Sequence, residues 1–407
     1  MSIPQAIQNI YRYIEAHKAP YIQNLRDAVA IPSVSAAPSR RDDCIRMMRW
    51  TEKMFRKLGA ETELCDIGKQ ELQNGSSIKR PPVLTAVIGR KPTKSTLLVY
   101  GHMDVVPPEE GWETEPFNLT EKDGKLYGRG AADNKGPMMA WVNAIDAYQS
   151  TKTDIPVNIK FFIEGLREIG SEGLLNLMLM KKKTFFNDIT YVCICDTSWA
   201  SLKKPSVSYG TRGLLYLSIT VEGLSKDVHS GEYGGAIPGF MNDVLQVTPE
   251  EERLYKSVTL DMEEMRREIG AIRLAHKEDK VRLLMHRWRF PKYLEKTFKL
   301  RKSPNKLGIK VLETTHPWSD NPLTPHFTAA IKAVKDAFQV EPDLVREGTS
   351  MPICNMLQEV TEETSMVLLP LANRNDKVHA ANEKIDSKNY ILGIKLFVAY
   401  LHELSLV

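Results

Sequence analysis

The sequence predicts an α/β fold, in which a mainly parallel sheet covered by helices on both faces is interrupted by an inserted α+β domain. Short, continuously apolar segments alternate with segments whose apolar residues recur at helical spacing, a pattern typical of buried parallel strands and their connecting helices. This alternation stops near Ser206 and resumes after about Glu313. We therefore expect a discontinuous main domain, residues 1–205 and 314–407, and an inserted domain at residues 206–313.

Each element of the main domain has its own signal. Residues 4 to about 58 are predicted to be mostly helical, because apolar residues recur at helical spacing until Gly59 ends the run. In the inserted domain, residues 214–221 alternate as in a half-buried strand, and residues 249–269 form a charged helical stretch. Further strands are expected at 82–88, 96–100, 157–163, 191–195 and 366–371, and further helices at 136–149, 174–181, 324–338 and 388–404.

The composition is that of an ordinary globular protein. The chain has 407 residues, of which 42% are apolar and 26% charged, and a chain of this length can bury a large core. The net charge of +4 is small and the basic residues are scattered, so we expect no nucleic-acid partner. Because no apolar segment has the length of a membrane span, we expect no membrane partner either.

The five cysteines form an odd number without the spacing of a metal site or a disulfide framework. We expect them to be free thiols, which persist in reducing compartments. The N-terminal segment is amphipathic and charged rather than signal-like. Together these observations predict a cytoplasmic protein.

Side chains that can carry chemistry follow the predicted strands, and ligands of α/β sheets bind beyond the carboxyl ends of strands. His102 and Asp104 follow the strand 96–100 and, two residues apart, lie on one face of the chain. An imidazole and a carboxylate at this spacing suit a metal ligand and the group that fixes its tautomer. A histidine with a purely structural role fits the same pattern.

Four further residues lie at similar places. Each alone is explained by a helix cap, a solvated loop carboxylate or a hydrogen-bonded histidine. Together with His102, however, they offer five nitrogen and oxygen ligands at the expected ends of strands, which indicates a metal site. The four residues are Asp133, Glu168, Asp196 and His379.

These residues lie in segments that resemble the cytosolic non-specific dipeptidase and carnosine dipeptidase group of two-metal peptidases, in the aminoacylase-like metallopeptidase superfamily. The matching segments follow the family order over nearly the whole chain. They are VYGHMDVVPPEEGWETEPF, GKLYGRGAADNKGPMMAW, EGLREIGSEGL, KDVHSGEYGG, LMHRWRFP, EPDLVREGTSMP and VHAANEK.

The resemblance implies a two-ion metal site and a reaction. Asp104 would orient a metal-ligating histidine, and a water activated by the ions would hydrolyse the peptide bond of a dipeptide. Carboxylate and imidazole ligands fit zinc and manganese alike. One ion would be held by His102 and Asp196, the other by Glu168 and His379, and both by Asp133.

The resemblance also implies how a substrate and a partner subunit are bound. Glu347 and Ser350 would hold the two ends of the dipeptide. His229, in the inserted lid and dimerisation domain, would reach the partner subunit's site and stabilise the developing oxyanion. The resemblance therefore implies a homodimer.

One residue departs from the family pattern. Relatives carry two adjacent glutamates here, the first acting as general base and the second as metal ligand; in this chain Glu168 keeps the ligand position, but Arg167 occupies the base position. A guanidinium has no acceptor and stays protonated, so it cannot take a proton from water. A catalytically impaired pseudopeptidase that binds peptides or a partner subunit is therefore one alternative to the dipeptidase. An N-acyl amino acid deacylase is another.

The inserted domain departs from the pattern as well. Blocks of the family sequence are missing between Leu245 and Gln246 and between Pro291 and Lys292. The second block includes the strand with the arginine that clamps the substrate carboxylate. We therefore expect a shortened lid domain, explained by skipped segments or by genuine remodelling.

Overall fold

The computed structural model describes residues 4–72, 74–222, 295, 298–299, 306–362 and 364–407. The chain divides into two compact units, Met1–Arg212 with Pro317–Val407, and Gly213–His316. The first boundary predicted from the sequence, before residue 206, is wrong. Ser206–Ser208 forms strand β10 of the main sheet, where the buried Val207 pairs with the neighbouring strand, so the inserted unit begins only at Gly213.

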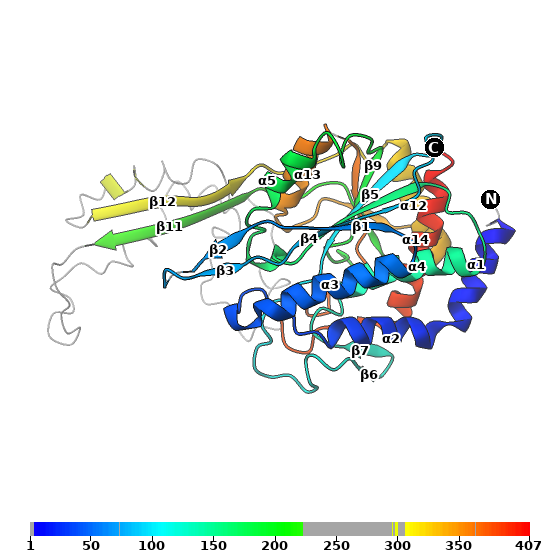
Figure 1. Cartoon of the computed structure of the whole chain (residues 1–407), viewed down its shortest axis with the longest axis horizontal. Helices are drawn as coiled ribbons and strands as arrows, with labels where there is room; N and C mark the ends of the chain where they lie inside the picture. Colours follow the sequence, from blue (N-terminus) through cyan, green and yellow to red (C-terminus); the bar gives the residue numbers. More distant parts are fainter. Residues whose placement is uncertain (1–3, 73, 223–294, 296–297, 300–305, 363) are drawn as a thin grey trace, which may run out of the picture. The chain divides into compact units, whose positions relative to one another are not determined.

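The main unit is built on an eight-stranded sheet with the order β1-β4-β8-β5-β9-β14-β10-β13 (Figure 1). Its four central strands, from β8 to β14, run parallel to one another. The pairs β1–β4, β4–β8 and β10–β14 are antiparallel, so the prediction of a mainly parallel sheet is confirmed. The strands are β1 (Glu61–Cys65), β4 (Val83–Ile88), β5 (Thr96–His102), β8 (Asn158–Glu164), β9 (Tyr191–Ile194), β10 (Ser206–Ser208), β13 (Asp343–Val345) and β14 (Met366–Leu368).

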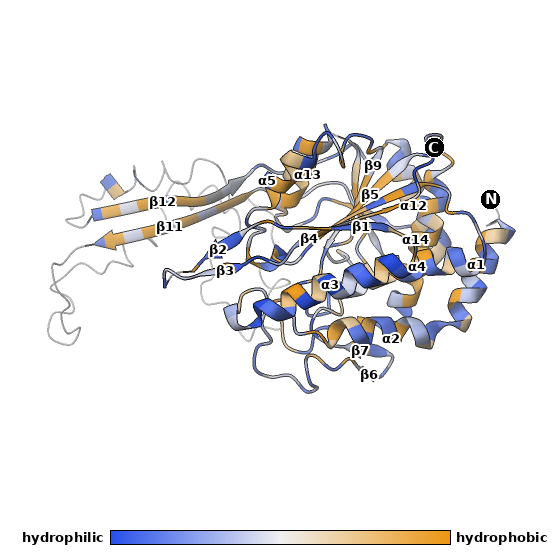
Figure 2. Ribbon diagram, in the orientation of Figure 1, coloured by the Kyte–Doolittle hydropathy of each residue, from blue (hydrophilic) through white to orange (hydrophobic). Residues whose placement is uncertain are grey.

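Helices cover both faces of this sheet because its strands are apolar on both sides. In β5, Leu97 and Val99 belong to one hydrophobic cluster, whereas Leu98 and Tyr100 belong to another, as the alternation of side chains along a strand requires. The first cluster contains residues of α1 (Gln5–Ala16), α2 (Lys18–Val29), α3 (Arg41–Lys57), α4 (Lys135–Ser150), α12 (Pro325–Phe338) and α14 (Ser387–Leu404); the second contains residues of α5 (Leu174–Lys181) and α13 (Pro352–Thr361). Figure 2 shows the central strands mostly in hydrophobic colours and the helices in both colours.

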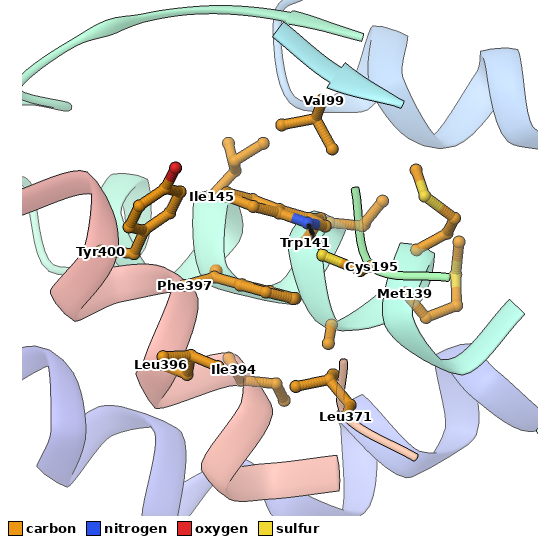
Figure 3. Close-up of a cluster of buried hydrophobic side chains, with 14 of the residues drawn as sticks. Val99, Met139, Trp141, Ile145, Cys195, Leu371, Ile394, Leu396, Phe397 and Tyr400 are labelled. Carbon is orange, nitrogen blue, oxygen red and sulfur yellow. Dashed lines mark hydrogen bonds between the residues drawn. The ribbon is translucent and has the colours of Figure 1, made fainter. Parts of the chain in front are cut away.

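Trp141 lies at the centre of the larger cluster (Figure 3). Its ring stacks on Phe397 with centroids 4.0 Å apart, and its indole N–H donates a hydrogen bond to Sγ of Cys195 at 3.3 Å. These contacts join α4, α14 and the end of β9. Because Cys195 directly precedes Asp196, the core holds the backbone at one of the predicted ligands.

Shorter elements complete the main unit. They are η1 (Pro38–Arg40), η2 (Arg167–Ile169), a hairpin of β2 (Lys69–Glu71) and β3 (Ser77–Lys79), and a small sheet of β6 (Thr120–Lys122), β7 (Lys125–Tyr127) and β15 (Lys384–Asp386). Among the described helices, none has the length and apolar character needed to cross a membrane.

The inserted unit contributes an antiparallel pair, β11 (Leu214–Glu222) and β12 (Lys306–Thr315). Side chains of β11 alternate between more and less exposed positions, which confirms the half-buried strand predicted there. The predicted helix at 249–269 and both predicted sites of missing sequence lie outside the described residues.

Candidate metal centre

The predicted ligands lie at the carboxyl ends of neighbouring parallel strands. His102 is the last residue of β5, Glu168 lies in η2 just after β8, and Asp196 follows β9. β8, β5 and β9 are adjacent and parallel, so their carboxyl ends meet at one edge of the sheet. The strands are buried up to this edge, and the polar side chains that follow them are brought together there.

A cavity of about 400 Å³ at this edge contains the whole predicted ligand set. The predicted substrate-binding residues Glu347 and Ser350 line the same cavity. Thr197, Ser198 and Thr349 line it as well and were missed from the sequence, because single small polar residues in loops carry no pattern. His229 lies outside the described residues. The predicted ligands that line the cavity are His102, Asp133, Glu168, Asp196 and His379. Arg167 lines the same cavity.

Asp133 lies between two groups of ligands. Its Oδ1 is 3.0 Å from Nε2 of His102, and its Oδ2 is 3.0 Å from Nε2 of His379. Nε2 of His379 is also 3.1 Å from Oε1 of Glu168, whereas Nε2 of His102 is 3.9 Å from Oδ2 of Asp196. The carboxylate of Asp133 is therefore placed to bridge two ligand groups.

The donor set fits a divalent cation. Ligand atoms of His102, Asp133 and Glu168 all lie within 4.8 Å of one another, and imidazole and carboxylate groups bind zinc and manganese. Oδ2 of Asp196 is buried without a hydrogen-bond partner in the described part of the chain, and the cation beside it is Arg167, whose Nε lies 3.4 Å away. A buried carboxylate oxygen requires such a neighbouring positive charge, because burying it alone is costly.

Neighbouring carboxylates raise the pKa values of both His102 and His379. Hydrogen bonds to Asp133 and Glu168 raise the pKa of His379 to about 10. Burial disfavours a charged His102, but its hydrogen bonds to Asp104 and Asp133 outweigh burial and raise its pKa well above the ordinary value. Because metal ligation requires neutral imidazoles, a divalent ion would bind here in competition with protons.

Asp104 connects His102 to the loop that carries Arg167 and Glu168. Nδ1 of His102 lies 3.1 Å from the carbonyl oxygen and 3.3 Å from Oδ1 of Asp104. The same carboxylate accepts the backbone N–H groups of Arg167 at 3.1 Å and Glu168 at 3.0 Å. With Nδ1 donating to Asp104, the lone pair of Nε2 is directed into the cavity.

Arg167 contributes a fixed positive charge to the ligand set. Its Nε lies 3.4 Å from Oδ2 of Asp196, and 22% of its side chain is exposed. Burial disfavours the charged guanidinium, but Asp196, Tyr100 and Glu164 outweigh burial and raise its pKa further. The group therefore stays protonated and cannot accept a proton from water.

Glu383 is a supporting residue that the sequence analysis missed. One of its carboxylate oxygens accepts the backbone N–H groups of Gly130, Ala132 and Asp133 at 3.1, 3.0 and 3.1 Å, and the other accepts Nη1 of Arg129 at 2.8 Å. These bonds hold the turn that carries Asp133. The segment VHAANEK contains this glutamate, but no local pattern shows that its partners lie about 250 residues earlier in the chain.

Fold and site together define an α/β protein with a group of His, Asp and Glu side chains at the ends of its strands that could hold a metal ion, an arrangement typical of metallohydrolases. The profile of peptidase family M20/M25/M40 matches residues 98–403. The chain belongs to this family, and the predicted resemblance is confirmed.

Two relatives and two solved structures cover nearly the whole chain. Human Beta-Ala-His dipeptidase is 36% identical over 99% of this chain and 93% of its own length, and Cys-Gly metallodipeptidase dug1 of Schizosaccharomyces pombe is 33% identical over 99% of both. The crystal structure of human carnosine dipeptidase 1 has a TM-score of 0.83 at 34% identity and full coverage of both chains. The dipeptidase Dug1p from Saccharomyces cerevisiae has a TM-score of 0.82 at 30% identity, covering 98% of this chain and 99% of its own.

The alignment with human Beta-Ala-His dipeptidase runs over 475 positions, more than the 407 residues of this chain. It therefore includes positions at which this chain has no residue. The placement of these positions in the inserted domain stays a prediction.

Proposed function

We propose that the protein is a metal-dependent dipeptidase whose turnover is slowed by Arg167. The observation that carries the proposal is that one cavity brings together five metal-ligand side chains and two predicted substrate-binding side chains. Two relatives that align with almost the whole chain are named as dipeptidases, which supports the substrate class.

Some residues of the cavity would bind the metal and others would bind the substrate. A divalent zinc or manganese ion at these ligands would polarise the scissile carbonyl and acidify a bound water. The ligands form two groups of three that share Asp133, and each group offers nitrogen and oxygen ligands to a divalent ion. Asp104 keeps Nε2 of His102 available to the cavity. The carboxylate of Glu347 would bind the ammonium end of the dipeptide, and the hydroxyl of Ser350 its carboxylate end.

Arg167 determines the expected rate. General-base catalysis contributes about 10² to 10⁴ in rate, and a guanidinium cannot supply it. The same residue favours a second candidate function, in which the chain binds dipeptides without hydrolysing them.

Hydrolysis of a dipeptide panel by wild type and Arg167→Glu, with added Mn²⁺ or Zn²⁺, tests the proposal. We expect slow turnover by wild type and turnover about 10² to 10⁴ times faster by the variant. Arg90→Glu is a matched control, because Arg90 pairs with Glu61 at the exposed surface, and its rate should equal that of wild type. Turnover by the variant alone would favour the binding function, and cleavage of N-acyl amino acids alone would favour a deacylase. If wild type and variant neither bind nor cleave dipeptides, the proposal is wrong.

We also propose that the protein forms a homodimer through the inserted unit, as the resemblance implies, with His229 reaching the partner's site. Tyr216 on β11 and Val311 and Leu312 on β12 are exposed apolar side chains, which supports a contact surface in this unit. Size-exclusion chromatography with light scattering should give the mass of a dimer. The mass of a monomer would contradict this part of the proposal.

The cellular location is a further proposal. All five cysteines are free and buried, which supports a reducing compartment such as the cytoplasm. Microscopy of the tagged full-length chain should show cytoplasmic protein, and a signal confined to another compartment would contradict the proposal.

A further inference from the structure

We propose that the guanidinium of Arg167 takes the place of one of the two metal ions, so that the chain binds a single divalent ion at Asp133, Glu168 and His379. This inference rests on the proposed metal-dependent function and deepens it. It concerns how many ions the site holds and which ligands hold them.

The five ligands form two groups of three, each of which could hold one ion, and Asp133 belongs to both. We call His102, Asp133 and Asp196 the inner group, and Asp133, Glu168 and His379 the outer group. The groups differ in exposure at one residue: the side chain of His379 is 51% exposed, whereas His102, Asp196 and Glu168 are 1%, 10% and 7% exposed. An ion bound to His379 would therefore be open to substrate on that side.

Arg167 and an ion in the inner group require the same oxygen. Oδ2 of Asp196 is 3.9 Å from Nε2 of His102 and 3.4 Å from Nε of Arg167. A divalent ion binds a carboxylate oxygen at about 2.0–2.2 Å, so an ion held by this oxygen would lie within about 6 Å of the guanidinium. Two metal ions tolerate a closer approach because they share bridging ligands, but a guanidinium has no lone pair with which to bind a metal.

The surroundings of Arg167 keep it beside Asp196. Its backbone N–H is bonded to the buried carboxylate of Asp104, which fixes the start of the side chain. The charge of the guanidinium is favoured by Asp196, Tyr100 and Glu164. Glu164 is itself buried and held by hydrogen bonds from the hydroxyls of Tyr100 and Ser171, so this acidic environment is part of the core.

The guanidinium already places one positive charge beside the inner group, because its Nε lies 3.4 Å from Oδ2 of Asp196. In the outer group, Nε2 of His379 lies 3.0 and 3.1 Å from the oxygens of Asp133 and Glu168. An ion at His379 would therefore add its charge to carboxylates other than the one that Arg167 pairs with.

Isothermal titration calorimetry of the metal-stripped, full-length chain with Mn²⁺ tests the inference, because it counts bound ions without any turnover. We expect one ion per chain for wild type and two for Arg167→Met, which removes the charge but retains bulk. In wild type, His379→Ala should abolish binding, whereas His102→Ala should retain the ion. In Arg167→Met, His102→Ala should remove the second ion. Circular dichroism should establish that each variant is folded.

Wild type that binds two ions with affinities within about tenfold of each other would overturn the inference. It would also be overturned if the single ion of wild type were lost with His102→Ala and retained with His379→Ala. Absence of Mn²⁺ and Zn²⁺ binding by wild type and Arg167→Met alike would contradict the proposed function itself. Two ions in wild type with slow dipeptide turnover would overturn the present inference and leave the proposed function standing.

Discussion

Replacing Glu383 with glutamine is expected to destabilise the fold strongly although the side chain keeps its size. The side chains of Arg129 and Glu383 are each 1% exposed and lie 2.8 Å apart. The amide oxygen of glutamine can still accept the backbone N–H groups of the Asp133 turn, but its NH₂ group would face Nη1 of Arg129, donor to donor. Removing one partner of a buried ion pair costs about 3–5 kcal/mol, and we expect a loss of this size.

The free energy of unfolding should be measured by urea denaturation at pH 8 in EDTA, so that metal binding does not contribute. Glu61→Gln is the control, because it removes a carboxylate from an exposed pair with Arg90 and should leave the midpoint unchanged. Glu383→Ala should in addition lower Mn²⁺ affinity by about 10–100-fold, as is typical when a group supporting a metal ligand is lost. A Glu383→Gln protein within about 1 kcal/mol of wild type would refute the role assigned to this pair.

Three further predictions concern the core, pH and metal removal. Phe397→Ala should cost about 3–5 kcal/mol in urea unfolding, because this fully buried ring stacks on Trp141 (Figure 3); a loss below about 1 kcal/mol would contradict the packing. Burial lowers the pKa of His326 to about 3, so between about pH 6.5 and 3 the unfolded chain binds more protons there, and stability contributed by neutral His326 is lost as pH falls through this window. Between pH 7 and 4.5, the free energy of unfolding should therefore fall by about 2–3 kcal/mol less in His326→Gln than in wild type. Equal losses in both proteins would refute this assignment. Adding Mn²⁺ at 100 times its Kd to EDTA-treated protein should stabilise it by about 2.7 kcal/mol, a gain that His379→Ala should abolish; equal gains in both proteins would place the ion elsewhere.

The central strands were predictable because burial on both faces makes them continuously apolar. The expected strands at 82–88, 96–100 and 157–163 correspond to β4, β5 and β8, all buried. β1 was not predicted, because it pairs at the edge of the sheet and most of its residues are partly or fully exposed. β10 was assigned to the wrong unit, because a strand of three residues carries no signal that it pairs with β13 and β14.

The ligands were predictable for a different reason. His102, Glu168 and Asp196 lie within five residues of the ends of predicted strands, and parallel neighbours place such residues at one edge. Glu383 acts through backbone N–H groups of a turn far away in the sequence, and backbone donors leave no trace in residue types. The contact between Arg167 and Asp196 likewise depends on the adjacency of loops after β8 and β9, on either side of β5, which three-dimensional structure alone supplies.

Anomalous diffraction from crystals of the full-length protein grown with Mn²⁺ would locate the bound metal. We expect one strong peak, coordinated by Asp133, Glu168 and His379, with the guanidinium of Arg167 beside Asp196. A second peak of similar height between His102 and Asp196 would contradict the single-ion centre. If none of the five predicted ligands coordinated manganese, the metal centre as a whole would be contradicted. These ligands are His102, Asp133, Glu168, Asp196 and His379.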